Sequence, residues 1–191
     1  MRNVAFISML VILLALLISC ATETEYLTYS EYGFSFKYPK AFSVSVAPLF
    51  ENQRRADDNS GVVRVRPTMS IFPVFAVSWI KVMQSTWETN GSLEASLEDG
   101  FELVERHLAG VARVERGEFA ETSGAGHQML YQYYTVTSID SEAWKAYGIV
   151  GVFYCDNSEK VFTLQTMNAA VSAKQDVLED FMNYLGSFVC Y

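Results

Sequence analysis

The sequence predicts an α+β fold, in which an antiparallel β-sheet is flanked by helices and a lipoprotein signal peptide precedes the folded part. Three features support this prediction: an apolar leader that ends at Cys20, short strand-like segments of period two, and an amphipathic helical segment after each of two groups of strands. The order of a group of strands and then a helix occurs twice along the chain. This order indicates an α+β sandwich rather than a doubly wound sheet. We expect a signal peptide over residues 1–19, a lipidated cysteine and tether over 20–25, and one domain over 26–191.

The leader has the order of a secretory signal. Arg2 precedes an apolar run from Val4 to Ile18, which is shorter than the roughly 20 residues that a membrane span needs. Its end, Leu17-Ile18-Ser19-Cys20, resembles the lipobox of bacterial lipoproteins. We therefore expect Cys20 to carry lipid and to hold the protein at the extracytoplasmic face of the cell membrane. An ordinary secretory signal with an incidental cysteine is the alternative.

Short strands open the folded part. Period-two alternation and aromatic enrichment predict strands over 26–29, 33–38 and 42–46, with a turn at Pro39-Lys40. Residues 51–61 are polar and rich in turn formers, so we expect a surface loop there. Strands resume over 62–66 and 74–83, and the prolines between them confine the intervening stretch to strand ends or an edge.

A helix follows this first group of strands. Ser92 is a suitable N-cap, and apolar residues recur with helical spacing up to Gly110, a plausible stop: Leu93, Leu97, Phe101, Val104 and Leu108. Strands are then expected over 111–122, 126–137, 143–155 and 160–167, joined by connections of hairpin length. A second helix from about Val171 to Phe188 closes the chain.

Two stretches resemble the PsbP-like and DcrB-like lipoprotein family, which includes the extrinsic photosystem II protein. The first, from Tyr29 to Pro39, is similar to the opening hairpin of that family, in which an aromatic-Gly-Phe turn leads into a strand that ends at Tyr-Pro. The usual Gly-Trp after it is Ala41-Phe42 here. The second stretch comprises the carboxy-terminal strands and the helix that ends at Gly186-Ser187-Phe188. The resemblance implies an antiparallel sheet flanked by helices and a noncatalytic accessory role, with no common catalytic motif to transfer.

The charge and the motif content exclude several functions. A net charge of −8 without a clustered basic surface argues against nucleic acid as a partner. The sequence contains no HExxH or CxxC motif, nucleophile elbow, P-loop or dinucleotide fingerprint. His107 and His127 lie in different predicted elements, so we expect no metal site, no cofactor and no catalytic residues.

The acidic segments are interpreted as solvated surface. Glu94, Glu98 and Glu102 follow one face of the first helix, and a row of this kind diverges into solvent, whereas calcium ligands must converge. The segment Asp57-Asp58-Asn59-Ser60-Gly61 lacks the ligand spacing of a calcium loop, and we interpret it as a turn.

Tyrosines gather on adjoining predicted strands and form a candidate contact surface for a protein or a glycan: Tyr131, Tyr133, Tyr134, Tyr147 and Tyr154. Strand alternation places Tyr131 and Tyr133 on one face and Tyr134 on the other. Cross-strand pairing that stabilises the sheet is the alternative.

Two cysteines remain besides Cys20. The strand after Cys155 carries the chain away by about 25 Å at about 3.3 Å per residue. The closing helix returns a similar length at about 1.5 Å per residue, which brings Cys190 back near Cys155. An extracytoplasmic location permits a disulfide between them. A buried thiol at Cys155 and a frayed terminal residue at Cys190 are the alternative.

Three functions compete. The first is a noncatalytic lipoprotein that binds a partner protein of the cell envelope, and the second is a small-molecule or lipid binder with a pocket between sheet and helices. The third is a hydrolase with an unrecognised site. A deep apolar pocket with convergent polar groups would favour the second function, and a shallow surface with one exposed aromatic patch would favour the first.

Overall fold

The computed structural model describes residues 24–68, 74–139, 144–168 and 174–191. The expected signal peptide over 1–19, Cys20 and the first part of the tether lie outside the described residues. In the part of the chain that is described, no helix has both the length and the apolar character needed to cross a membrane.

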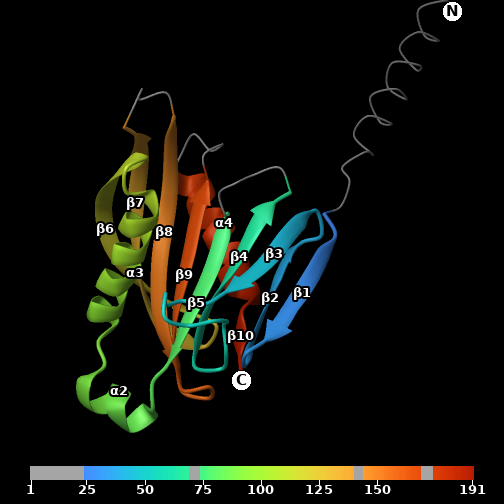
Figure 1. Ribbon diagram of the computed structural model, residues 1–191, viewed down its shortest axis with the longest axis vertical. Helices are drawn as coiled ribbons and strands as arrows, with labels where there is room; N and C mark the ends of the chain where they lie inside the picture. The colour runs from blue at the N-terminus through green and yellow to red at the C-terminus, as the bar shows by residue number, and fades with distance from the viewer. Residues whose placement is uncertain (1–23, 69–73, 140–143, 169–173) are drawn as a thin grey trace, which may run out of the picture.

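A seven-stranded antiparallel sheet forms the centre of the fold (Figure 1). Its spatial order is β3-β4-β5-β9-β8-β7-β6, so that β5 and β9 join the two groups of strands. The strands are β3 (Phe42–Ala47), β4 (Ser60–Pro67), β5 (Phe75–Lys81), β6 (Ala112–Gly124), β7 (His127–Ser138), β8 (Lys145–Cys155) and β9 (Lys160–Asn168).

Helices cover both faces of this sheet. Helix α3 (Leu93–Leu108) lies on one face, and helix α4 (Lys174–Ser187) lies on the opposite face (Figure 1). A small second sheet lies on the α4 side in the order β1-β2-β10, from β1 (Tyr26–Glu31), β2 (Phe34–Pro39) and β10 (Val189–Cys190).

The turn between β1 and β2 explains part of the opening sequence. Tyr32 and Gly33 both have positive φ, 53° and 75°, as a two-residue type I′ hairpin turn requires. Glycine adopts that conformation without strain, which accounts for the position of Gly33 in this hairpin.

The core is split by the sheet into two apolar clusters. Alternation along β5 directs Phe75, Val77 and Trp79 to the cluster beneath α4, and it directs Ala76 and Ser78 to the α3 side. The α4 cluster is dominated by aromatic rings; Phe34, for example, contacts Phe162 with ring centroids 5.2 Å apart in an edge-to-face arrangement. On the other side, the predicted face of α3 is buried against β7 and β8.

The predicted elements agree with the structure except at a few places. A short helix, α2 (Gln84–Asn90), follows β5 and was not expected from the sequence. The predicted loop over 51–61 ends early, since Ser60 already begins β4. Asp57 holds the preceding turn, because its Oδ1 accepts hydrogen bonds from the backbone N–H groups of Asn59 and Ser60 at 2.8 and 3.0 Å.

Candidate ligand groove between helix α3 and the sheet

The α3 side of the sheet is only partly covered. Helix α3 packs on β6, β7 and β8 and reaches β9 at its margin, whereas no substantial packing joins it to β4 or β5. A helix with side chains is about 10–12 Å wide, and strands lie about 4.8 Å apart, so one helix cannot cover all seven strands. A groove therefore remains between α3 and strands β4, β5 and β9.

Two adjoining recesses make up this groove, with volumes of about 260 and 310 Å³. They share five lining residues and are therefore one continuous feature, which we call the α3 groove; the shared residues are Leu49, Ser78, Gly100, Leu103 and Thr163. The larger recess, of about 310 Å³, reaches the lower limit of the volumes of small-ligand sites, which is about 300 Å³.

The recess beside the carboxy-terminal end of α3 is largely apolar. Val62 and Ala76 form its floor from β4 and β5, and Val104 and Leu108 form its wall from α3. The loop after β3 contributes Leu49 to the opposite wall. These side chains give the recess apolar walls, which are suited to an apolar ligand.

Arg64 and His107 lie at this end of the groove. The Nη2 of Arg64 is 3.4 Å from the Nε2 of His107, and the Nδ1 of His107 is 2.8 Å from the carbonyl oxygen of Leu103. Nδ1–H therefore donates to that carbonyl, which leaves the Nε2 lone pair to accept from Arg64. Burial, and then the charge of Arg66, lower the pKa of Arg64. Both effects oppose the charge of the guanidinium.

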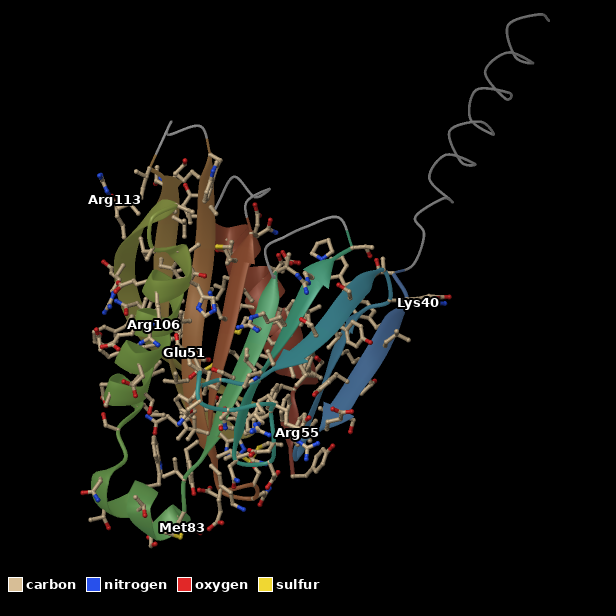
Figure 2. All side chains as sticks on the ribbon, viewed as in Figure 1. Lys40, Glu51, Arg55, Met83, Arg106 and Arg113 are labelled. Carbon is tan, nitrogen blue, oxygen red and sulfur yellow. A yellow bond between two sulfur atoms is a disulfide. The ribbon has the colours of Figure 1, made fainter. Side chains whose placement is uncertain are left out.

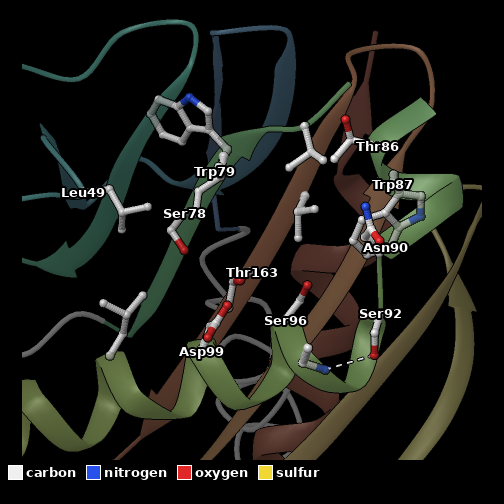
Figure 3. A pocket seen from close by; sticks show the side chains of 17 residues that line it. Leu49, Ser78, Trp79, Thr86, Trp87, Asn90, Ser92, Ser96, Asp99 and Thr163 are labelled. Atoms are coloured by element: carbon white, nitrogen blue, oxygen red, sulfur yellow. Dashed lines mark hydrogen bonds between the residues drawn. The ribbon is translucent and has the colours of Figure 1, made fainter. Parts of the chain in front are cut away.

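The other recess carries several hydroxyl groups. Ser78, Thr163 and Ser96 carry their hydroxyl groups between α3 and the strands, and Asp99 lies beside them (Figure 3). Ser92 caps α3, as the sequence predicted, because its Oγ accepts from the backbone N–H of Ala95 at 3.2 Å.

Helix α2 closes this end of the groove. It buries no residue fully, but the ring of Trp87 stacks on Tyr154 with centroids 4.7 Å apart. The hydroxyl of Tyr154 donates to the carbonyl oxygen of Val82 at 3.1 Å. These contacts fix the position of α2 against β8.

The close approach of α3 to the sheet depends on Gly100. A Cβ at this position would lie 2.9 Å from the Cγ2 of Thr163 and 3.0 Å from the Cγ1 of Val150. A larger residue would therefore force the side chains of Thr163 and Val150 to shift, and Thr163 lines the groove.

The five candidate tyrosines do not form one exposed surface, so that prediction is corrected. Tyr134 is 1% exposed and Tyr154 is 7% exposed, and both lie on the α3 side of the sheet. Tyr131, Tyr133 and Tyr147 are partly buried and pack on the opposite core. The alternative of stabilising contacts describes them better, because the sheet is covered by helices on both faces and the rings fill those layers.

The acidic face of α3 is exposed to solvent, as the sequence predicted, and Glu98 on this face also forms an ion pair. Arg116 on β6 donates to Glu98 at 2.6 Å and to Glu105 at 3.0 Å, and its guanidinium lies 4.8 Å from the centroid of the Phe101 ring. The hydrogen bond from Arg116 lowers the pKa of Glu98. These two carboxylates hold α3 against β6 through the guanidinium of Arg116.

A second cluster lies on the opposite face of the sheet, in the α4 core. The structure joins Cys155 to Cys190 by a disulfide with a Cα–Cα distance of 6.5 Å, and the Nε2 of His127 is 3.1 Å from the Sγ of Cys190. The ring of His127 also stacks on Phe153. Three potential metal ligands therefore meet here, but the disulfide occupies both sulfur atoms.

The labelled basic side chains lie at separate places on the surface. Lys40, Arg55, Arg106 and Arg113 occupy different parts of the molecule (Figure 2). Lys40 is paired with Glu25 at 2.6 Å.

The sequence did not reveal the groove residues, although one signal was present. Arg64 interrupts a run of three valines in β4, Val62, Val63 and Val65. Alternation places it on the same face as Val62, where a charged side chain needs a special explanation. Leu49 and Trp87 carry no comparable signal, because they reach the groove from a loop and from a helix with no buried residue.

The arrangement of an antiparallel sheet between α3 and α4 is the PsbP-like α+β sandwich, as the sequence predicted. Among solved structures, the chain is similar to the cyanobacterial PsbP (CyanoP) of Synechocystis sp. PCC 6803, with a TM-score of 0.56 and 16% identity over 90% of this chain and 96% of that one. It is also similar to the Saccharomyces cerevisiae Ran-binding protein Mog1p, with a TM-score of 0.50 and 9% identity over 88% of this chain and 96% of that one. At these identities the likeness shows the fold. No family model and no curated protein matches the chain in sequence.

Proposed function

We propose that this chain is a noncatalytic binding protein of the cell envelope, held at the extracytoplasmic face of the membrane by lipid on Cys20. The lipobox-like end of the leader supports the anchor. A disulfide between Cys155 and Cys190 is compatible with an oxidising compartment.

The α3 groove is the observation that carries the proposal. It combines a continuous recess, apolar walls and polar groups at both ends, which is the composition of a small-molecule site. Both ring nitrogens of His107 are already engaged, and Asp99 lines only the recess that does not contain His107. This separation supports binding rather than acid–base catalysis, which requires the two groups to meet at one reacting atom.

Binding of a partner protein is a second candidate. Strand β6 forms one edge of the seven-stranded sheet, and its Phe119 is 66% exposed. An unpaired strand edge with an exposed aromatic side chain is a surface that a partner can extend or cover. The description of Mog1p as a Ran-binding protein supports a protein partner for this fold.

Site-specific photocrosslinking in native membranes tests the proposal. A photoreactive amino acid replaces Ser78 in the groove, Phe119 on the β6 edge, or Thr28 on β1 as an exposed control. We expect an adduct of small-molecule mass from position 78 and none from position 28. A protein adduct from position 119 would favour the second candidate, and the absence of an adduct from both positions 78 and 119 would contradict a binding role.

A further inference from the structure

We infer that the α3 groove binds a single-chain amphiphile with one negative charge, of the long-chain fatty acid class, with its carboxylate on Arg64. The inference rests on the proposed function, because it assumes that the groove is the binding site. It adds the chemical class of the ligand and the direction in which the ligand lies.

Among the described residues, no acidic side chain compensates the charge of Arg64. In the described ranges, five ion pairs join basic and acidic side chains, and none of them includes Arg64. The guanidinium of Arg64 contacts the Nε2 lone pair of His107. The distance of 3.4 Å between Nη2 and Nε2 is longer than that of a usual hydrogen bond. A partly buried cation in an apolar groove is stabilised by a bound anion, which restores the missing partner.

The lining of this recess also indicates the kind of anion. Since His107 accepts at Nε2 in this arrangement, Arg64 contributes the single positive charge among the residues that line this recess. One cation matches a monoanion better than a doubly charged phosphate. The planar guanidinium also matches the two oxygens of a carboxylate in a bidentate pair.

An apolar path leads away from Arg64 along the groove. It starts among Val62, Val104 and Leu108 and passes Leu103 toward Val82 and Trp87 at the α2 end. From His107 to Ser92, α3 extends about 22 Å at about 1.5 Å per residue. One acyl chain spans half of a hydrocarbon core that is about 30 Å thick, so the groove is long enough for one such chain.

The small volume of the groove limits the size of the ligand. Recesses of about 260 and 310 Å³ hold an extended chain, whereas a helix about 10–12 Å wide needs a far broader trough. A lipid with two acyl chains is also too large for recesses of this volume. A lipid-anchored protein is also held beside a source of single-chain fatty acids, the membrane itself.

Photoaffinity labelling of the full mature protein in polymer-stabilised membrane discs tests this inference. The probe is a long-chain fatty acid with a diazirine on its chain, and the comparison probe is the fatty alcohol with the same chain. Labelled peptides are identified by mass spectrometry. We expect the acid to label peptides from α3 and β5, and the alcohol to label them about ten- to hundredfold less, because a charge-assisted contact is lost.

Matched variants separate the carboxylate contact from general effects. Arg64→Leu should reduce acid labelling about ten- to hundredfold, while Arg64→Lys should retain part of it. Arg66→Leu removes an equal charge from the same face of β4 outside the groove, and it should leave labelling unchanged. Ser78→Trp should abolish labelling by filling the groove with Arg64 intact, which keeps the test decisive if Arg64→Leu fails to fold.

Equal labelling by acid and alcohol, or an effect of Arg66→Leu as large as that of Arg64→Leu, would overturn the inference. Absence of groove labelling would overturn it as well. If position 78 nevertheless crosslinks another molecule in native membranes, the proposed binding function stands and only the ligand class is wrong. A protein adduct at that position would identify a protein segment as the occupant instead.

Discussion

The disulfide between Cys155 and Cys190 provides the most quantitative test of the fold. It closes a loop with a sequence separation of 35 residues that contains β9 and α4. In the chain-entropy model, a loop of this length stabilises the folded protein by about 4 kcal/mol, because the bridge restricts the unfolded chain. A domain of this size has a total stability of about 5–15 kcal/mol, so the bridge is a large fraction of it.

Urea unfolding of the mature protein measures this contribution. The oxidised protein is compared with the phosphine-reduced protein and with a Cys155→Ala/Cys190→Ala variant, in which no lone thiol remains. We expect the reduced protein and the double variant each to have an unfolding free energy about 3–4 kcal/mol lower than that of the oxidised protein. The melting temperature should fall by about 6–16 °C, since each kcal/mol shifts it by about 2–4 °C. As the control, reduction of the double variant should leave its unfolding free energy unchanged.

Thiol labelling gives an independent readout. Unreduced mature protein that is denatured should take up no thiol label, and reduced protein should take up two. Two labels without reduction would refute the bridge. A loss of less than about 1 kcal/mol in both the reduced and the substituted protein would show that loop closure contributes far less than the model requires.

Three further predictions concern other parts of the molecule. Phe101→Ala should cost about 3–5 kcal/mol in urea unfolding, because the ring is fully buried under α3, and Phe101→Leu should cost less; equal, small losses would mean that this face of α3 contributes little packing. Lys160 is 2% exposed and donates to Asp58 at 2.7 Å, and this hydrogen bond lowers the pKa of Asp58. The pair therefore stabilises the fold above about pH 4, the unfolded pKa of an aspartate, and this contribution is lost as the pH falls through the lowered pKa. Asp58→Asn should cost about 1–3 kcal/mol at pH 7 and progressively less as the pH falls below about 4, and a cost that does not change with pH would exclude this linkage. Intact-mass analysis of membrane-extracted protein should show loss of residues 1–19 and added acyl mass, and a Cys20→Ser variant that is still processed and membrane-bound would contradict the lipobox interpretation.

Much of the fold was predictable because its elements carry strong local periodicity. Helix α3 presents Leu97, Phe101 and Val104 on one face, and the structure buries all three. Helix α2 was missed because it is short and buries no residue, so no apolar period marks it. The two faces of the tyrosine-bearing strand followed from alternation, but the sequence did not show that both faces would be covered by helices.

The sequence by itself therefore determined the α+β class, most strand and helix positions and the end of the apolar leader at Cys20. Tertiary structure decided which strands lie next to each other, and the pairing of β5 with β9 is the clearest case, because those strands belong to different sequence groups. It also decided the α3 groove. One helix is too narrow to cover seven strands, and the uncovered part contains Arg64 with no acidic partner among the described residues. Period and alternation are properties of neighbouring residues, whereas a groove and an unpaired charge depend on which distant segments fail to meet.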